Sequence, residues 1–243
     1  MTDQTVAIVT CTGDRPEALA MCRGYVERQD YCGATQWVVV DDGDVPTFGI
    51  ARRGSRSVVY ERLASGSPAP ASYCANLLVA LEWAGDNGSE WVVFMEDDDF
   101  YSPEHVRRLL SHASEGVHLI GDPMRRHYHL PTRQARAFTC SHTASLAQTA
   151  IHRELIPDLL AILRRGKLNV DATLWRKTPS KRKIFVSEWT QVGIKGLPGR
   201  PGIGVGHRPD GPRWDPDPEL QTLGWWVGSA VETYERFACT PVH

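Results

Sequence analysis

Four consecutive acidic residues, Glu96-Asp97-Asp98-Asp99, directly follow the apolar run 91–95. Adjacent carboxylates repel one another and raise the free energy of the folded state unless positive charge lies among them. Carboxylate oxygens suit a hard divalent cation such as Mg²⁺ or Mn²⁺, and such an ion commonly joins carboxylates to the phosphates of a nucleotide. The string therefore indicates a site for a metal ion and a phosphorylated ligand.

A second interpretation of the string is structural, because acidic residues are also favoured just before a helix. Ser102 and Pro103 predict the start of a helix a few residues later. Two features favour a site instead. The acids end what resembles a buried strand, and two earlier apolar runs also end in polar residues. The earlier runs are 6–10, followed by Thr12, Asp14 and Arg15, and 36–40, followed by Asp41 and Asp42.

The segments between these runs have the character of helices. One extends from Pro16 to about Gln29, and another extends from Ser72 to Trp83 with apolar residues at helical spacing. Alternation of strand and helix over the first ~120 residues predicts an α/β fold with a mostly parallel, twisted sheet flanked by helices. Ligands of such sheets bind beyond the carboxyl ends of the strands. We therefore expect the three polar clusters to meet at one edge of the sheet.

Charge is distributed unevenly along the chain. Residues 1–122 hold 9 Lys and Arg against 19 Asp and Glu, whereas residues 123–183 hold 13 against 3. Such asymmetry is typical of a region that meets a polyanion. The alternative is that the basic segment balances the acidic half and binds the phosphates of its own ligand.

Composition excludes several classes of protein. The six cysteines form no C-x-x-C pair, which argues against a zinc ribbon and against a disulfide scaffold. No stretch approaches the roughly 20 apolar residues of a membrane span. The N-terminus has no basic region before its first apolar run, so it does not resemble a signal peptide. We expect a cytoplasmic protein without membrane contact; the sequence indicates no oligomeric state.

The order of these segments resembles glycosyltransferases of the GT-A fold, especially the large family-2-like group. The resemblance is carried by VAIVTCTGDRP (6–16), WVVVDDG (37–43), a helix with Asn76, and VVFMEDDDFYSP (92–103). Members of the group carry a metal-binding DxD in the setting F-L-D-x-D-D-x-x-x-P. Glu96 occupies the first acid position here, which leaves open whether Glu96 and Asp98 or Asp97 and Asp99 form the functional pair.

The resemblance implies a Rossmann-like GT-A domain that moves a sugar from a nucleotide-sugar, first of all a UDP-sugar, with inversion. Residues 1–122 would bind the donor, and the more irregular residues 123–243 would bind the acceptor and carry catalysis. Mn²⁺ or Mg²⁺ would be held by Glu96, Asp98, Asp99 and His207. The donor would be bound by Thr10, Thr12, Arg15, Asp41, Asp42, Asn76, Asp97, Lys195 and Arg200.

Two features of the second half fit this family. Asp171, in NVDATLWRK, would act as the general base, and the surrounding cations would help to keep it ionised. Its other interpretation is a residue at the start of a surface helix. The Gly- and Pro-rich segment 193–212 predicts a long lid loop, in which Lys195 and Arg200 clamp the diphosphate and His207 reaches the metal; the alternative is a loop without ligands.

The acceptor is predicted from the basic segment alone. Arginines with interleaved aromatic residues are typical of a nucleic-acid surface, and small GT-A enzymes of viral origin glycosylate hydroxymethylated DNA bases. DNA is thus the first acceptor to consider, and a viral enzyme would work in the host cytoplasm. Alternatives are a glycan or small-molecule acceptor, a nucleotidyltransferase, or a catalytically inactive binding module. The residues expected to contact the acceptor are Arg125, Arg126, Trp175 and Arg176.

Overall fold

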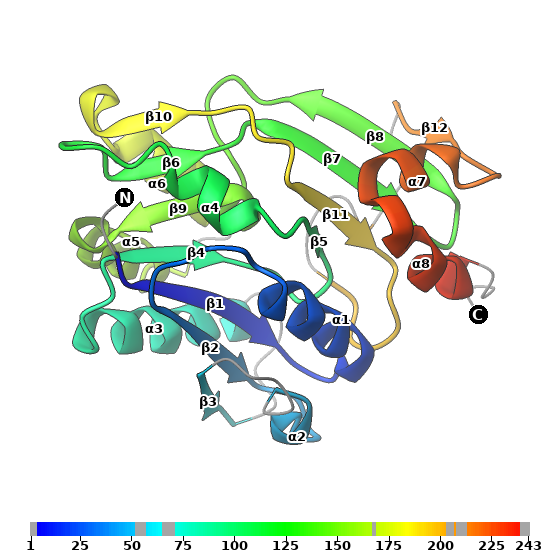
Figure 1. Cartoon of the computed structure of the whole chain (residues 1–243). Helices are drawn as coiled ribbons and strands as arrows, with labels where there is room; N and C mark the ends of the chain where they lie inside the picture. The colour runs from blue at the N-terminus through cyan, green and yellow to red at the C-terminus, as the bar shows by residue number, and fades with distance from the viewer. Residues whose placement is uncertain are drawn as a thin grey trace.

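The computed structural model describes residues 4–51, 57–64, 71–166, 169–202, 207 and 213–238. Within these ranges the strands form two sheets (Figure 1). The seven-stranded sheet has the order β10 (Lys183–Phe185), β6 (Leu119–Gly121), β9 (Thr149–His152), β4 (Trp91–Phe94), β1 (Val6–Thr12), β2 (Thr35–Asp41) and β3 (Val58–Arg62). The five-stranded sheet has the order β12 (Asp215–Pro216), β8 (Gln134–Thr139), β7 (Met124–His129), β11 (Gln191–Lys195) and β5 (Phe100–Tyr101).

The large sheet is mostly parallel. Strands β1, β2, β3 and β4 run in the same direction, β10 runs parallel to β6, and β9 is antiparallel to both of its neighbours. Residues 6–9 of β1 are buried on both faces, as a central parallel strand requires. The α/β architecture with a parallel-rich sheet flanked by helices, expected from the sequence, is confirmed.

Helices cover both faces of the large sheet (Figure 1). Side chains of α3, α5 and α6 pack on one face, whereas α1, α4, α7 and α8 contribute to the core on the other. Pro16 begins α1, where a missing backbone N–H costs nothing. The helices are α1 (Pro16–Glu27), α2 (Phe48–Ala51), α3 (Ala71–Asp86), α4 (His105–Leu110), α5 (Ile156–Leu163), α6 (Val170–Lys177), α7 (Gln221–Val227) and α8 (Val231–Ala238).

The two halves of the chain share the large sheet, since β6, β9 and β10 extend the strands of the first 94 residues. One part of the expected lid is a strand: residues 193–195 belong to β11 and pair with β7. Residues 196–202 form the described part of the loop, and the remainder, apart from His207, lies outside the described residues. None of the described helices combines the length and hydropathy needed to cross a membrane.

Candidate active site

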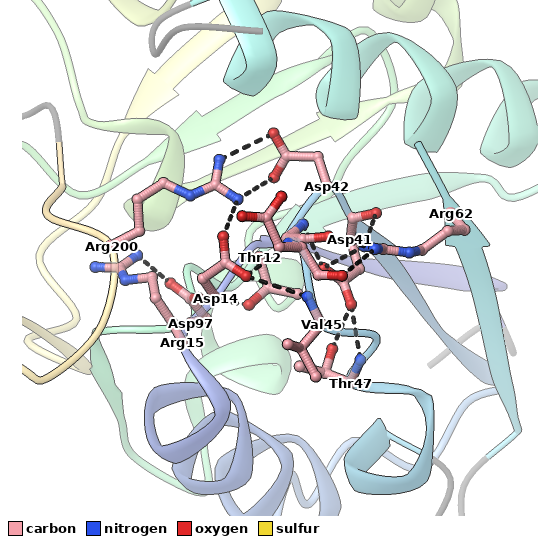
Figure 2. A network of polar contacts seen from close by, with 12 residues as sticks. Thr12, Asp14, Arg15, Asp41, Asp42, Val45, Thr47, Arg62, Asp97 and Arg200 are labelled. Atoms are coloured by element: carbon pink, nitrogen blue, oxygen red, sulfur yellow. Dashed lines mark hydrogen bonds and ion pairs between the residues drawn. The ribbon is translucent and has the colours of Figure 1, made fainter. Parts of the chain in front are cut away.

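The carboxyl ends of β1, β2 and β4 meet at one edge of the large sheet, because the three strands are parallel neighbours. Thr12 at the end of β1 donates a hydrogen bond of 2.8 Å from Oγ1 to Asp97 Oδ2, just after β4. Arg15 donates to Asp97 at 2.6 Å (Figure 2) and, through its other terminal nitrogen, to Asp98 at 2.6 Å. The first and third polar clusters of the sequence therefore form one polar network.

The acidic string is buried rather than spread into solvent. Asp97, Asp98 and Asp99 are each less than 5% exposed. Lys195 at the end of β11 lies 2.9 Å from Asp99 Oδ1 and 3.7 Å from Asp98 Oδ2. Arg15 and Lys195 are thus the positive charges that such a string requires.

The pKa values of the string reflect burial and mutual repulsion. Burial and the neighbouring carboxylates raise the pKa of Glu96 to about 8. Burial raises the pKa of Asp97 and of Asp99 to about 6, although the nearby cations oppose the rise. Burial also acts on Asp98, but Arg15 and Lys195 outweigh it and hold its pKa well below the ordinary value. The protein's own cations therefore only partly neutralise the string.

The string fits a divalent cation. One carboxylate oxygen from each of Glu96, Asp98 and Asp99 lies within 4.8 Å of the other two. When all four carboxylates are ionised, Arg15 and Lys195 leave an excess of two negative charges, which a divalent ion would neutralise. The donor atoms are hard oxygens, which Mg²⁺ and Mn²⁺ prefer. Glu96 and Asp98 face the adjoining cavity, whereas both oxygens of Asp99 already accept hydrogen bonds from Gln191 and Lys195.

His207 lies at the same place. Its Nε2 is 3.5 Å from Asp98 Oδ2, the oxygen that Arg15 also contacts. Burial and Lys195 lower the pKa of His207 to about 4, so the imidazole is neutral near pH 7. A neutral imidazole is the form that coordinates a metal.

Two adjoining cavities lie at this edge of the sheet, and the acidic string lines one of them. The larger, of about 380 Å³, is lined by Glu96, Asp97, Asp98, Lys195 and Asp171 among others. The smaller, of about 90 Å³, is lined by Thr12, Asp42, Asn76 and Arg200 among others. Both cavities share the lining residues Cys11, Arg15, Tyr73 and Gly202. They therefore form one groove with a narrow end and a wider end.

Asp171 lies in the wider end of the groove, in the first turn of α6. Arg125 on β7 places Nη2 3.6 Å from Asp171 Oδ2. The carboxylate is partly exposed, as a base that meets an incoming hydroxyl must be. The structure thus brings the expected base and the acidic string to one cavity.

Thr10 and Asp41 do not face the groove, contrary to the expectation from the sequence. Thr10 is fully buried: its Oγ1 donates to Met95 O at 2.8 Å and accepts from Trp37 Nε1 at 2.9 Å. Asp41 is also fully buried and accepts hydrogen bonds from the turn after β2 and from β3 (Figure 2). Its partners are the backbone N–H groups of Gly43 and Thr47, the Thr47 hydroxyl, the Tyr60 hydroxyl and Arg62.

Two of the four expected acceptor residues are structural. The Trp175 indole is fully buried and stacks on Phe185 with ring centroids 4.4 Å apart, so it offers no surface to an acceptor. Arg126 is 5% exposed, and its Nη2 donates to the carbonyl oxygens of Trp189 and Gln191. Arg125 lies beside Asp171, and Arg176 is exposed on α6.

The loop after β11 covers the narrow end of the groove. Arg200 donates to both carboxylate oxygens of Asp42 at 3.1 Å and to Asp14 at 3.3 Å (Figure 2). Asp14, with a φ of 54°, also accepts hydrogen bonds from the backbone of Asp44 and Val45. Asp14 thus connects the loops that follow β1, β2 and β11.

Sequence reasoning missed several residues of this site. Tyr73 precedes Asn76 by three positions on α3, a spacing that places two side chains on the same helix face and was a usable signal. Gln191 carried no signal, because only the antiparallel pairing of β11 with β5 brings it to Asp99. Cys11 lines both cavities, and burial raises its pKa well above the ordinary value.

No protein-family model matches the sequence, and no curated protein matches it. Solved structures of TarS from S. aureus share the fold. TarS residues 1–349 in complex with UDP superpose with a TM-score of 0.58 at 17% identity, over 79% of this chain and 60% of that one. A longer TarS structure superposes with a TM-score of 0.57 at 16% identity, over 79% of this chain and 37% of that one. This chain therefore spans less than two thirds of the length of the TarS chains it resembles, and it shares with them a GT-A-like fold.

Proposed function

We propose that this chain is a metal-dependent glycosyltransferase that moves a sugar from a UDP-sugar to an acceptor hydroxyl. The observation that carries the proposal is the groove, in which a narrow cavity lined by Asp42, Asn76 and Arg200 adjoins a wider one lined by Glu96, Asp98 and Asp171. The structures that share the fold are of a glycosyltransferase, one of them in complex with UDP. A UDP-sugar whose nucleoside lies in the narrow end would have its transferred sugar beside the acidic string.

Each part of the groove has a chemical role in this reaction. Asp171 takes the proton of the acceptor hydroxyl as its oxygen attacks the anomeric carbon, and the nucleoside diphosphate leaves from the opposite side with inversion. Glu96, Asp98 and His207 would hold Mn²⁺ or Mg²⁺, which supplies Lewis-acid stabilisation of charge on the leaving diphosphate. The loop that carries Arg200 limits access of water to the donor.

DNA remains a prediction for the acceptor, and the structure weakens its compositional basis. Some cations of residues 123–183 are partly buried and pair within the fold: Arg182 with Glu154, and Arg125 with Asp171. A basic surface for a polyanion needs cations that face solvent instead. A hydroxyl on a glycan or a small molecule therefore fits the groove at least as well as a hydroxymethylated base.

The test is ligand binding followed by product analysis. UDP with Mn²⁺ should raise the melting temperature by several degrees, because a ligand present at 100 times its Kd contributes about 2.7 kcal/mol. Asp98→Asn should abolish the metal-dependent part of that shift. The enzyme should then release UDP from a UDP-sugar, whereas a nucleotidyltransferase would release pyrophosphate from UTP. Absence of any stabilisation by nucleotide-sugars would refute the proposal.

Asp171→Asn tests the base separately from the donor site. The variant should bind UDP with unchanged affinity, because the carboxylate lies in the wide end of the groove. UDP release from the donor should fall by 10²- to 10⁴-fold, which is the usual contribution of a general base. Arg164→Gln, in an exposed ion pair with Glu82, serves as the control. Undiminished turnover would remove Asp171 from this role.

A further inference from the structure

Arg15 occupies the junction between the two ends of the groove. Its side chain lines both cavities, as does that of Tyr73. A nucleoside in the narrow end and a sugar in the wide end are joined by two phosphates, and these must pass the residues that the cavities share. The groups at the junction therefore meet phosphate oxygens rather than a nucleobase.

The guanidinium of Arg15 has hydrogen-bonding capacity left over. An arginine carries five N–H donors in a rigid fork, and Arg15 uses one on Asp97 and one on Asp98. Its Nε is buried and has no hydrogen-bond partner in the described structure. The two carboxylates fix the plane of the fork, and the remaining N–H groups stay available for an acceptor of negative charge.

Tyr73 adds a neutral donor at the same place. The ordinary pKa of a tyrosine hydroxyl is about 10, so Tyr73 carries its proton at neutral pH and can donate it to an acceptor. Among the described residues, the acceptor near this hydroxyl is Glu96 Oε1, at 3.4 Å, which is beyond the usual length of such a bond. The hydroxyl can therefore turn to a phosphate oxygen without losing a strong bond.

We infer that Arg15 and Tyr73 form the diphosphate subsite of the groove, so that Arg15 contacts phosphate rather than the nucleobase. The inference rests on the proposed function and assigns a part of the same site. A planar guanidinium matches the geometry of a phosphate, and charge-assisted bonds of this kind are about twice as strong as neutral ones. Asp97 and Asp98 then have a further role, which is to orient Arg15.

Affinities for uridine, UMP and UDP in the presence of Mn²⁺ test the subsite, by calorimetry for the nucleotides and ligand-observed NMR for uridine. Arg15→Gln should weaken UDP binding about 10- to 100-fold, which corresponds to the loss of charge-assisted hydrogen bonds, and should change uridine affinity less than twofold. Tyr73→Phe should weaken UDP binding several-fold and leave uridine unaffected. Arg164→Gln, at the exposed ion pair with Glu82, should change none of the three.

The outcomes distinguish a failure of the diphosphate subsite from a failure of the proposed function. Equal losses of affinity for uridine and UDP in Arg15→Gln would overturn the subsite and would indicate that Arg15 contacts the nucleobase. Unchanged UDP affinity in both variants would also overturn it. Tyr73→Phe removes one hydroxyl, so it decides the matter where Arg15→Gln fails to fold. A wild-type protein that binds no UDP with Mn²⁺ would instead overturn the proposed function, and the subsite with it.

Discussion

At the scale of single residues, the site depends on charges that are removed from water together. Lys195 is 9% exposed and Asp99 is 2% exposed, and their charged atoms are 2.9 Å apart. A buried ion pair contributes little net stability compared with apolar residues of the same shape. Loss of one partner is costly, however, because the other charge stays buried and unpaired.

Lys195→Met tests this cost. The side chain keeps its length, but Asp98 and Asp99 lose a cation, so the free energy of unfolding should fall by roughly 3–5 kcal/mol. Urea denaturation at pH 7 measures the change. Lys181→Met, at an exposed position, is the matched control and should stay within about 0.5 kcal/mol of wild type. A loss below about 1 kcal/mol for Lys195→Met would contradict the ion-pair account.

The residues of the site could be predicted only in part from the sequence. Ordered strand ends pointed to Thr12, Arg15 and the acidic string, because parallel neighbours bring their carboxyl ends together. The sequence could not decide between Asp41 and Asp42. Successive side chains of a strand point in opposite directions, so only one of the pair can face the groove, and tertiary packing made it Asp42.

At the scale of elements, the placement of α6 depends on close packing behind Asp171. A Cβ atom on Gly121 of β6 would lie 2.5 Å from Trp175 Cζ2 and 2.7 Å from Ala144 Cβ. The indole therefore packs directly on the backbone of the sheet, and it aligns the helix that carries the base. The sequence predicted that Trp175 contacts the acceptor, because an aromatic side chain can stack on a sugar or a base. Its complete burial shows that its role is structural instead.

Gly121→Ala should consequently destabilise the protein. The added methyl group overpacks the contact with Trp175 and should cost about 1–3 kcal/mol. Gly24→Ala is the matched control: it lies inside α1, and no atom within 4 Å would meet its Cβ. That change should stabilise by about 0.4–1 kcal/mol through helix propensity and chain entropy. Thermal unfolding of the two variants measures the difference, and a stabilised Gly121→Ala would show that α6 can shift freely.

Strand β11 shows why element boundaries escaped prediction. Its last three residues, 193–195, belong to a segment rich in Gly and Pro, which predicts a loop. Pairing with β7 on one side and β5 on the other, together with complete burial, overrides that local preference. The helices α1 and α3 were predicted to within a few residues, because their apolar periodicity is decided locally.

At the scale of the whole molecule, the two sheets meet where strands from distant parts of the chain pair. The large sheet contains strands from residues 6–12 up to 183–185, and β5 joins the small sheet directly after the acidic string. Helix α4 follows β5, and its His105 reaches the segment before β11: Nδ1 lies 2.8 Å from Thr190 Oγ1. The contact between α4 and the segment before β11 therefore joins the two sheets, and its loss would destabilise the whole fold.

His105 makes that stability depend on pH. It is 1% exposed, and burial lowers its pKa from 6.5 to about 3. Below about pH 6.5, His105 binds a proton in the unfolded chain but not in the folded chain. The contribution of the neutral His105 to the free energy of unfolding is therefore complete above pH 6.5 and is lost as the pH falls. At pH 5 the loss should be about 2 kcal/mol, or roughly 1.4 kcal/mol per pH unit.

His105→Gln isolates this contribution, because all other titrating groups are shared with the wild type. The variant keeps a polar group near Thr190 but has no proton to bind between pH 8 and 4. The difference in unfolding free energy between wild type and variant, from urea titrations at each pH, should therefore shrink by about 2 kcal/mol between pH 7.5 and pH 5. A constant difference across that range would mean that the buried imidazole takes up its proton in the folded state as readily as in the unfolded chain. Helix α4 would then have to open at the junction of the two sheets.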